Sequence, residues 1–221
     1  LLDIVDPGQS YSAQLFQDQA RAAFRDIATR NKVPILSGGT GFYVQAALED
    51  MRFPEGEQDD NPLRAHYEAL QAQQGNEALW NLLNEKDPAA AKLIHPNNFK
   101  RVIRALEMHE EGVSYADQVK NIRSLPSIRF FLEVDPLILA ERINARVDMM
   151  REEGLVEEVE ALMARGFEEA LTAPKAIGYK EIIAYEKGEI TLDEAFRQIK
   201  TATRRYAKRQ RSWFRRDGRL I

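Results

Sequence analysis

The residues with the clearest potential for chemistry are the lysines and arginines of KRQRSWFRR, residues 208–216. Residues 197–219 hold ten of the 31 basic residues of the chain but only one of the 35 acidic ones. This stretch therefore carries a charge of +9, whereas the other 198 residues carry −13. Such an asymmetry favours a polyanionic partner, either nucleic acid or a phosphorylated ligand. A solvated charged face is the alternative, but hardly any acids balance the bases here.

A helical wheel at about 100° per residue separates the two kinds of side chain in this segment. One arc contains Lys200, Arg204, Lys208, Arg211 and Arg215, with Arg205, Arg209 and Arg216 beside it. The opposite side contains Ile199, Ala202, Tyr206, Gln210, Trp213 and Phe214. We expect the aromatic side to anchor the helix and the arginine arc to face outward, where it would contact phosphates.

A second candidate is SGGTGFY, residues 37–43, which follows a short apolar run and precedes a helical pattern. Glycines at such a junction allow a close approach of backbone or ligand, and the free amides of a helix start favour an anion. The motif is neither GxGxxG nor GxxxxGK[ST], so these residues alone favour a plain tight turn over an anion site.

Arg142 and Arg146 lie one helical turn apart in ERINARVDMM. Two guanidinium groups on one helix face could bind a diphosphate through bidentate hydrogen bonds. They could also form surface ion pairs with nearby acids, namely Glu141, Asp148 or Glu152.

The elements around these motifs indicate an α/β layer. Residues 10–30 have helical periodicity, with Ser10 or Ser12 as the N-cap, and residues 33–36 read as a strand before the glycine turn. IRFFLEVD, residues 128–135, reads as a second strand, followed by a helix over residues 136–164 and two helices joined at Gly188. Strand, turn and helix in this order are typical of a parallel sheet.

Residues 50–126 differ from the segments on either side, because every periodic pattern in them is typical of a helix. Helices are expected at residues 63–74, 77–85, 88–94 and 97–111, and Gly112 is the expected stop of the last. We therefore expect a helical domain inserted between residues 1–49 and residues 127–221 of the α/β core.

Composition excludes several classes of protein. The chain has no cysteine, so disulfides, thiol catalysis and cysteine-bound zinc are ruled out. His66, His95 and His109 are too scattered for a metal site. No apolar run approaches the roughly 18 residues that span a bilayer, and no signal peptide is visible, so a cytoplasmic protein without membrane contact is expected. The chain opens on Leu1 in a pattern typical of the middle of a domain, and we expect it to be a fragment.

The motifs GGTGFY, HPNNFKR, AIGYKE and AKRQRSWF occur in this order over nearly the whole chain. In these motifs the chain resembles the bacterial tRNA dimethylallyltransferases, also called tRNA isopentenyltransferases. The resemblance implies a core like that of P-loop NTPases, with a parallel sheet and an inserted all-helical domain that binds tRNA. It also implies transfer of a dimethylallyl group from dimethylallyl diphosphate to the exocyclic amine of adenosine 37 in the tRNA anticodon stem-loop, giving isopentenyladenosine. The target base would have to be flipped out of its stack.

The resemblance also implies roles for individual residues. Thr40 would meet the target nucleotide near the reaction channel, and Arg146 would hold the diphosphate, which makes these two the candidate catalytic residues. Contacts to tRNA are implied for Thr40 and Arg64 and for three segments: Lys100, Arg101, Val102, Ile103 and Arg104; Lys175, Ala176, Ile177, Gly178, Tyr179 and Lys180; and Lys208, Arg209, Gln210, Arg211, Ser212, Trp213, Phe214 and Arg215.

Members of the resembled family use Mg²⁺, a P-loop and an aspartate base, which we expect upstream of Leu1. The 221 residues alone are therefore expected to be inactive and to hold no metal, and we expect a monomer. Two other functions stay open: an adenylate dimethylallyltransferase acting on a free nucleotide, and a non-catalytic RNA-binding fragment. The first would need neither the helical insertion nor the basic last helix, whereas an upstream GxxxxGK[ST] loop would exclude the second.

Overall fold

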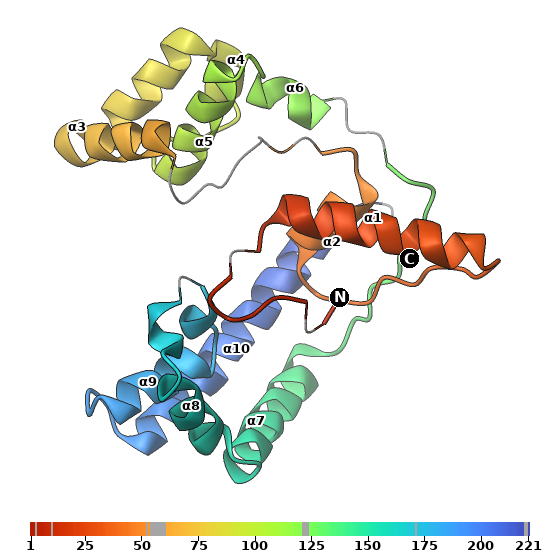
Figure 1. The fold of residues 1–221 in the computed structure, drawn as a ribbon, viewed down its shortest axis with the longest axis vertical. Helices are drawn as coiled ribbons and strands as arrows, with labels where there is room; N and C mark the ends of the chain where they lie inside the picture. The colour runs from red at the N-terminus through yellow and green to blue at the C-terminus, as the bar shows by residue number, and fades with distance from the viewer. Residues whose placement is uncertain are drawn as a thin grey trace. The chain divides into compact units, whose positions relative to one another are not determined.

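The computed structural model describes residues 1–2, 4–9, 11–51, 53, 61–120, 124–170, 172–218 and 221. By its contacts, the chain divides into two compact units. Unit 1 comprises Leu1–Ala47 and Pro126–Ile221, and unit 2 comprises Leu48–Leu125. The bounds of unit 2 lie within two residues of the expected insertion, residues 50–126. Figure 1 shows the helices of each unit with their labels.

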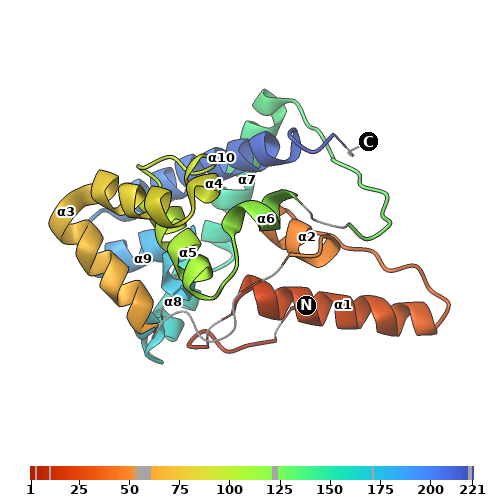
Figure 2. The same cartoon turned by 90° about the horizontal axis from the view of Figure 1, so that it is seen from above.

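The bundle of unit 1 is formed by its second segment. Its elements are α7 (Pro136–Glu152), α8 (Leu155–Met163), the 3₁₀ turns η1 (Phe167–Glu169) and η2 (Ala173–Lys175), α9 (Tyr179–Glu186) and α10 (Leu192–Phe214). The long helix α10 packs on both α7 and α9, as Figures 1 and 2 show. The shared core is apolar and includes Val147, Val159, Phe167, Ile182, Phe196 and Ile199.

Two further helices of unit 1 come from its first segment, α1 (Ala13–Thr29) and α2 (Gly41–Leu48). Ser12 caps α1, because its hydroxyl accepts a hydrogen bond from the amide of Leu15. The buried side-chain amide of Gln17 donates to the carbonyl of Ala46 over 2.8 Å, and the rings of Phe16 and Tyr43 stack 4.5 Å apart. These contacts hold α2 against α1.

The predicted parallel-sheet core is wrong for the described residues, because none of them forms a strand of a sheet. The two expected strands, residues 33–36 and 128–135, are not helical, but no backbone hydrogen bond between described residues joins them. Several of their apolar side chains face solvent: Ile35 is 86% exposed and Leu132 is 89% exposed. Composition and alternation give a segment the preference for a strand, but a strand forms only against a partner of matching register.

The helix predicted over residues 136–164 is interrupted. Gly154 has a φ of +94°, in the left-handed region, and separates α7 from α8. The helix starts at Pro136, as expected, and the Asp135 carboxylate caps it by accepting from the amide of Leu137 over 2.8 Å. A left-handed glycine ends a helix at no steric cost, so the chain turns there and α8 packs back on α7.

Unit 2 is helical in its described part. It contains α3 (Pro62–Lys86), α4 (Pro88–Ala91), α5 (Phe99–Glu110) and α6 (Tyr115–Lys120). Helix α3 is kinked at Gly75, whose φ is +84°, close to the break expected there. Figure 2 shows α3 beside α5, and their interface buries Leu79, Leu83, Val102 and Leu106 completely. The isolated antiparallel bridge between Glu49 and Ser124 joins the two ends of the unit.

No helix in the described part of the chain is long and apolar enough to cross a membrane.

Candidate functional site

Helix α10 begins as a core element and ends as a basic surface. The hydroxyl of Thr191 caps it by accepting from the amide of Glu194, and its first half buries Ala195, Phe196 and Ile199 in the core of unit 1. In its second half, basic residues follow each other closely and the apolar positions are few. The first half therefore anchors the second half, which displays most of the basic residues of the segment.

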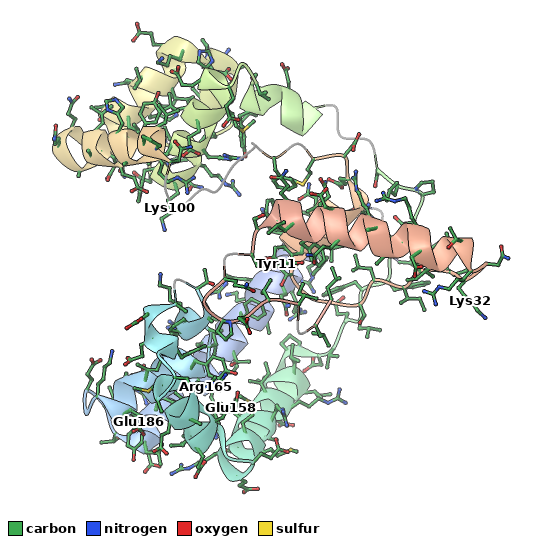
Figure 3. All side chains as sticks on the ribbon, viewed as in Figure 1. Tyr11, Lys32, Lys100, Glu158, Arg165 and Glu186 are labelled. Carbon is green, nitrogen blue, oxygen red and sulfur yellow. The ribbon has the colours of Figure 1, made fainter. Side chains whose placement is uncertain are left out.

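Part of the arc expected to face outward is instead turned toward acceptors of unit 1. Lys200 pairs with Asp148 on α7 over 2.5 Å, and Arg204 donates to the Asn144 side chain over 2.5 Å. Figure 3 shows how densely side chains fill this part of unit 1. The predicted outward orientation is thus wrong for Lys200 and Arg204, because a helical wheel does not include acceptors that lie about 50 to 60 residues away in the sequence. Lys208 of the same arc is exposed as predicted.

Two further members of that arc, Arg211 and Arg215, share one carboxylate. The Oε1 atom of Glu133 accepts from Arg211 over 3.0 Å and also from Arg215. Hydrogen bonds from these two guanidinium groups lower the pKa of Glu133 below its usual value. The predicted phosphate-binding pair is therefore occupied by a side chain of the protein itself.

The other basic residues of α10 line an open hollow of about 510 Å³. Its lining residues are all exposed, namely Arg205, Lys208, Arg209, Ser212, Trp213 and Arg216. Within the described part of the chain, no carboxylate pairs with any of its four cations, and the Arg209 guanidinium lies 5.7 Å from the ring centre of Tyr206. Trp213 is 39% exposed, so the indole lies at the surface and is not buried in the core as the wheel predicted.

The glycine turn before α2 packs directly on the end of α10. The side-chain amide of Gln210 donates to the carbonyl of Gly39 over 2.7 Å. A Cβ atom built on Gly41 would lie 2.2 Å from Cδ1 of Trp213, closer than any real contact. The turn therefore needs glycine to admit the helix, and Thr40 is left exposed between the two glycines. The predicted role of Thr40 at the target nucleotide stays a prediction.

A larger cavity of about 700 Å³ lies among α7, η2 and α10. Its lining combines four cationic side chains, Arg142, Arg146, Lys175 and Arg209, with a mainly apolar set that includes Ile143, Met150, Ile177 and Tyr206. The cationic groups come from three elements that are far apart in sequence. Cations beside an apolar wall suit a ligand with a charged end and a hydrocarbon end.

Arg146 forms an ion pair in this cavity, as one alternative expected, although with a different acid. Its NH1 atom lies 2.9 Å from Oε2 of Glu153, and both side chains are more than half exposed. The expected partners were Glu141, Asp148 and Glu152, none of which pairs with Arg146 among the described contacts. Exposed ion pairs are worth at most about 1 kcal/mol, so an anionic ligand could replace Glu153 at little cost.

The segment AIGYKE is held rigidly at the edge of the cavity. Gly178 has a φ of +104°, and its amide donates to the buried Glu181 carboxylate over 2.9 Å, which fixes the start of α9. The Tyr179 hydroxyl donates to Glu158 over 2.6 Å, and this bond raises the pKa of Tyr179 to about 12. The turn thereby places Lys175, Ala176 and Ile177 in the cavity wall, while Lys180 is exposed nearby.

In unit 2, the segment Lys100 to Arg104 is divided between surface and core. Lys100 and Arg101 are exposed, and Figure 3 shows Lys100 at the start of α5 pointing away from the helix. Val102 and Ile103 are 0% and 2% exposed, so their predicted contacts with RNA are corrected to core packing. An amphipathic helix alternates faces within five residues, so a contiguous binding segment always includes buried positions.

Arg64 and Arg104 both bind the carboxylate of Glu107, a residue that the sequence motifs did not identify as functional. Glu107 accepts from Nε of Arg64 over 2.9 Å and from NH1 of Arg104 over 3.3 Å. The sequence does contain a signal for this residue, because an acid stands three positions after Arg104 on the apolar face of α5.

The described residues contain no cluster of metal ligands. Among them, no group of three or more His, Asp or Glu side chains lies close enough to hold a metal ion. The Mg²⁺ that the resemblance implies stays a prediction.

The exposed basic hollow and the cationic cavity both have the chemistry that suits phosphate compounds. The chain belongs to the IPP transferase family, which matches residues 1–217. This membership confirms the predicted family and the predicted enzyme class, a prenyltransferase that modifies RNA.

The relatives with this assignment cover nearly the whole chain. The tRNA dimethylallyltransferase of Carboxydothermus hydrogenoformans is 43% identical over 226 residues, which span 100% of this chain and 72% of the relative. The tRNA dimethylallyltransferase of an Exiguobacterium species is 46% identical over 97% of this chain and 68% of its own length.

Solved structures agree with this assignment. The full-length tRNA isopentenylpyrophosphate transferase of Bacillus halodurans is 40% identical, with a TM-score of 0.65 over 99% of this chain and 69% of that protein. A eukaryotic dimethylallyltransferase acting on tRNA has a TM-score of 0.77 at 27% identity, over 95% of this chain and 54% of that protein.

Proposed function

We propose that this chain takes part in transferring a dimethylallyl group from dimethylallyl diphosphate to the exocyclic amine of adenosine 37 in tRNA. The observation that carries the proposal is the cavity of about 700 Å³, in which cations and an apolar wall face the same space. Dimethylallyl diphosphate has the matching halves, a dianionic or trianionic head and a five-carbon tail. The names of the relatives support the choice of this donor and of tRNA as acceptor.

Arg142 and Arg146 are assigned to the diphosphate head. They stand one turn apart on α7 and both line the cavity, and guanidinium groups match the geometry of phosphate oxygens in bidentate pairs. Among the described contacts Arg142 has no ion pair, and the partner of Arg146 is an exposed glutamate that an anion can replace. Because the bond that breaks leaves its electron pair on the diphosphate, cations held here stabilise the leaving group as charge develops.

The apolar wall is assigned to the hydrocarbon tail. Ile143, Val147 and Ile177 contribute side chains to the cavity, and they can exclude water from the carbon that is attacked. The attacking amine is a weak nucleophile, because its lone pair is delocalised into the adenine ring. Holding donor and amine in line is therefore a large part of the catalysis. No step is assigned to Mg²⁺ or to a general base, the residues for both of which are expected upstream of Leu1.

The tRNA is assigned to the exposed hollow of α10 and to the start of α5. Arg205, Arg209 and Arg216 supply unpaired charge for backbone phosphates, and Trp213 supplies an aromatic face for a base. Thr40 lies beside this hollow through the contacts of its neighbouring glycines with α10. An adenylate dimethylallyltransferase would have no use for such a long basic surface, which favours tRNA over a free nucleotide.

Binding of dimethylallyl diphosphate to the 221-residue chain tests the proposal, with isothermal titration calorimetry as the measurement. Arg142→Ala is expected to weaken binding about tenfold or more, because a hydrogen bond to a charged group is worth about 1.5–3 kcal/mol. Arg165→Ala is the matched control, since Arg165 is an exposed cation of the same unit that does not line the cavity. Equal losses in the two variants would mean that the cavity is not the donor site.

A further inference from the structure

Glu107 is the most deeply buried acid in the described part of the chain. Its side chain lies on α5 with 1% exposure, among the apolar residues Val102, Ala105, Leu106 and Met108 of the unit 2 core. Moving a carboxylate out of water costs several kcal/mol unless the protein compensates the charge. A buried acid on an otherwise apolar helix face therefore calls for an explanation.

The compensation comes from two arginines, and they bind Glu107 differently. Arg64 binds in a bidentate manner, with Nε donating to Oε1 over 2.9 Å and NH2 donating to Oε2 over 3.1 Å. Arg104 donates to Oε2 through NH1 alone, over 3.3 Å. One carboxylate thus faces two guanidinium groups, and Glu111 is a second acid that acts on Arg104. Arg64 holds Glu107 through two hydrogen bonds, whereas Arg104 is held by Glu107 through one.

The cluster has an inner and an outer side. The Glu107 side chain is closed off from solvent, whereas the side chain of Arg104 is 21% exposed. Arg104 also stands one helical turn after Lys100 and three residues after Arg101, both exposed at the start of α5. Burial lowers the pKa of Arg104, while the hydrogen bond to Glu107 and the charges of Glu107 and Glu111 act in the opposite direction. Arg104 is therefore a partly exposed guanidinium group, held by Glu107, beside two exposed cations.

We propose that Glu107 is a positioning residue, which holds Arg104 in a fixed orientation so that unit 2 presents a ready-made contact for a phosphate of the tRNA backbone. The proposal rests on tRNA being the substrate. An arginine that is already fixed loses less conformational entropy on binding than a free surface arginine does. A purely structural role is the competing explanation, but apolar residues of similar volume often stabilise a core as well as a buried ion pair does.

Fluorescence anisotropy with a labelled anticodon stem-loop, measured across a salt series on the 221-residue chain, tests this proposal. Arg104→Ala is expected to weaken binding about tenfold and to reduce the slope of log affinity against log salt by about one unit. Glu107→Gln keeps the shape but removes the charge, and it is expected to give most of the same loss at a temperature where the fold is intact. Lys86→Ala is the control, because Lys86 is a cation of unit 2 paired with Glu110.

The double variant separates positioning from structure. If Glu107 acts through Arg104, then Glu107→Gln has no further effect on affinity once Arg104 is alanine. An equal additional loss in that background would overturn the proposal, and so would Glu107→Gln with unchanged affinity. If Glu107→Gln does not fold, Arg104→Ala decides alone, and an unchanged salt slope in that variant overturns the proposal.

The outcome for the wild-type chain distinguishes this inference from the proposed function. If the wild-type chain binds the stem-loop and Arg104→Ala binds it equally well, the positioning role of Glu107 is overturned but the proposed function is not. A wild-type chain that does not bind the stem-loop overturns both.

Discussion

Gln210 and Gly39, 171 residues apart in the sequence, are joined by a hydrogen bond of 2.7 Å from the side-chain amide of Gln210 to the carbonyl of Gly39. This bond ties the glycine turn of the first segment to the basic helix of the second. Two motifs that appear independent in the sequence are therefore parts of one surface. Thr40 and the exposed Trp213 are neighbours because this contact exists.

The first prediction concerns the close packing of that turn. Gly41→Ala is expected to destabilise the chain by about 1–3 kcal/mol, because the new Cβ atom would overlap the ring of Trp213. Urea unfolding followed by circular dichroism measures the change. Gly38→Ala is the control, since a Cβ atom there meets nothing within 4 Å. Equal stabilities for the two variants would show that α10 does not pack on the turn.

The second prediction separates the two sides of α10. Arg205→Gln is expected to reduce the salt dependence of stem-loop binding by about one unit, because Arg205 lines the exposed hollow without an acid partner in the described part of the chain. Arg211→Gln is expected to leave the slope nearly unchanged, because Glu133 already holds Arg211. The reverse result would restore the outward orientation that the wheel predicted.

Trp213 is predicted to act mainly on RNA. Its indole is 39% exposed, so Trp213→Ala should cost well under the roughly 3–5 kcal/mol of a fully buried tryptophan in stability. Loss of base stacking should weaken stem-loop binding by about 1–3 kcal/mol, and Trp213→Phe should retain most of the affinity. Thermal melts and anisotropy on the same samples measure both effects. A large loss of stability with proportionate loss of binding would place the indole in the core.

The pH dependence of stability is predicted from Tyr179. Its pKa is raised to about 12 by the hydrogen bond to Glu158, so folding favours the protonated hydroxyl. The contribution is fully present below the unfolded pKa of about 10 and is lost as the pH rises from there through about 12. The stability difference between the wild type and Tyr179→Phe should therefore be constant up to about pH 9 and should shrink above pH 10. Urea midpoints across this range measure it, and a difference that grows above pH 10 would refute the assignment.

Local features of the fold were predictable from the sequence, because they depend on neighbouring residues. Ser12 as a cap, Pro136 as a helix start and Gly75 as a break all follow from short-range sterics and hydrogen bonds. The composition of residues 128–135 predicted a strand, but the described residues form no sheet. A strand needs a partner, and several apolar side chains of this segment are exposed instead.

The sequence motifs predicted which residues belong to the candidate site, but not which way their side chains face. The wheel identified the basic residues of α10, but Asp148 and Glu133 decide which of them are already paired. The pairing of Arg146 with Glu153 likewise depends on how the end of α7 turns. Glu107 escaped notice because its importance lies in burial, which a motif does not show.

Formation of isopentenyladenosine is the most direct test of the proposed function. In a chimera, this chain would replace the matching 69% of the Bacillus halodurans enzyme. The chimera would be incubated with dimethylallyl diphosphate and an anticodon stem-loop, and the nucleosides would be analysed by mass spectrometry. The same enzyme reassembled from its own parts through the same junctions is the control. We predict isopentenyladenosine at position 37 and its loss with Arg142→Ala. A folded chimera that binds the stem-loop but forms no product, while the control is active, would contradict the account.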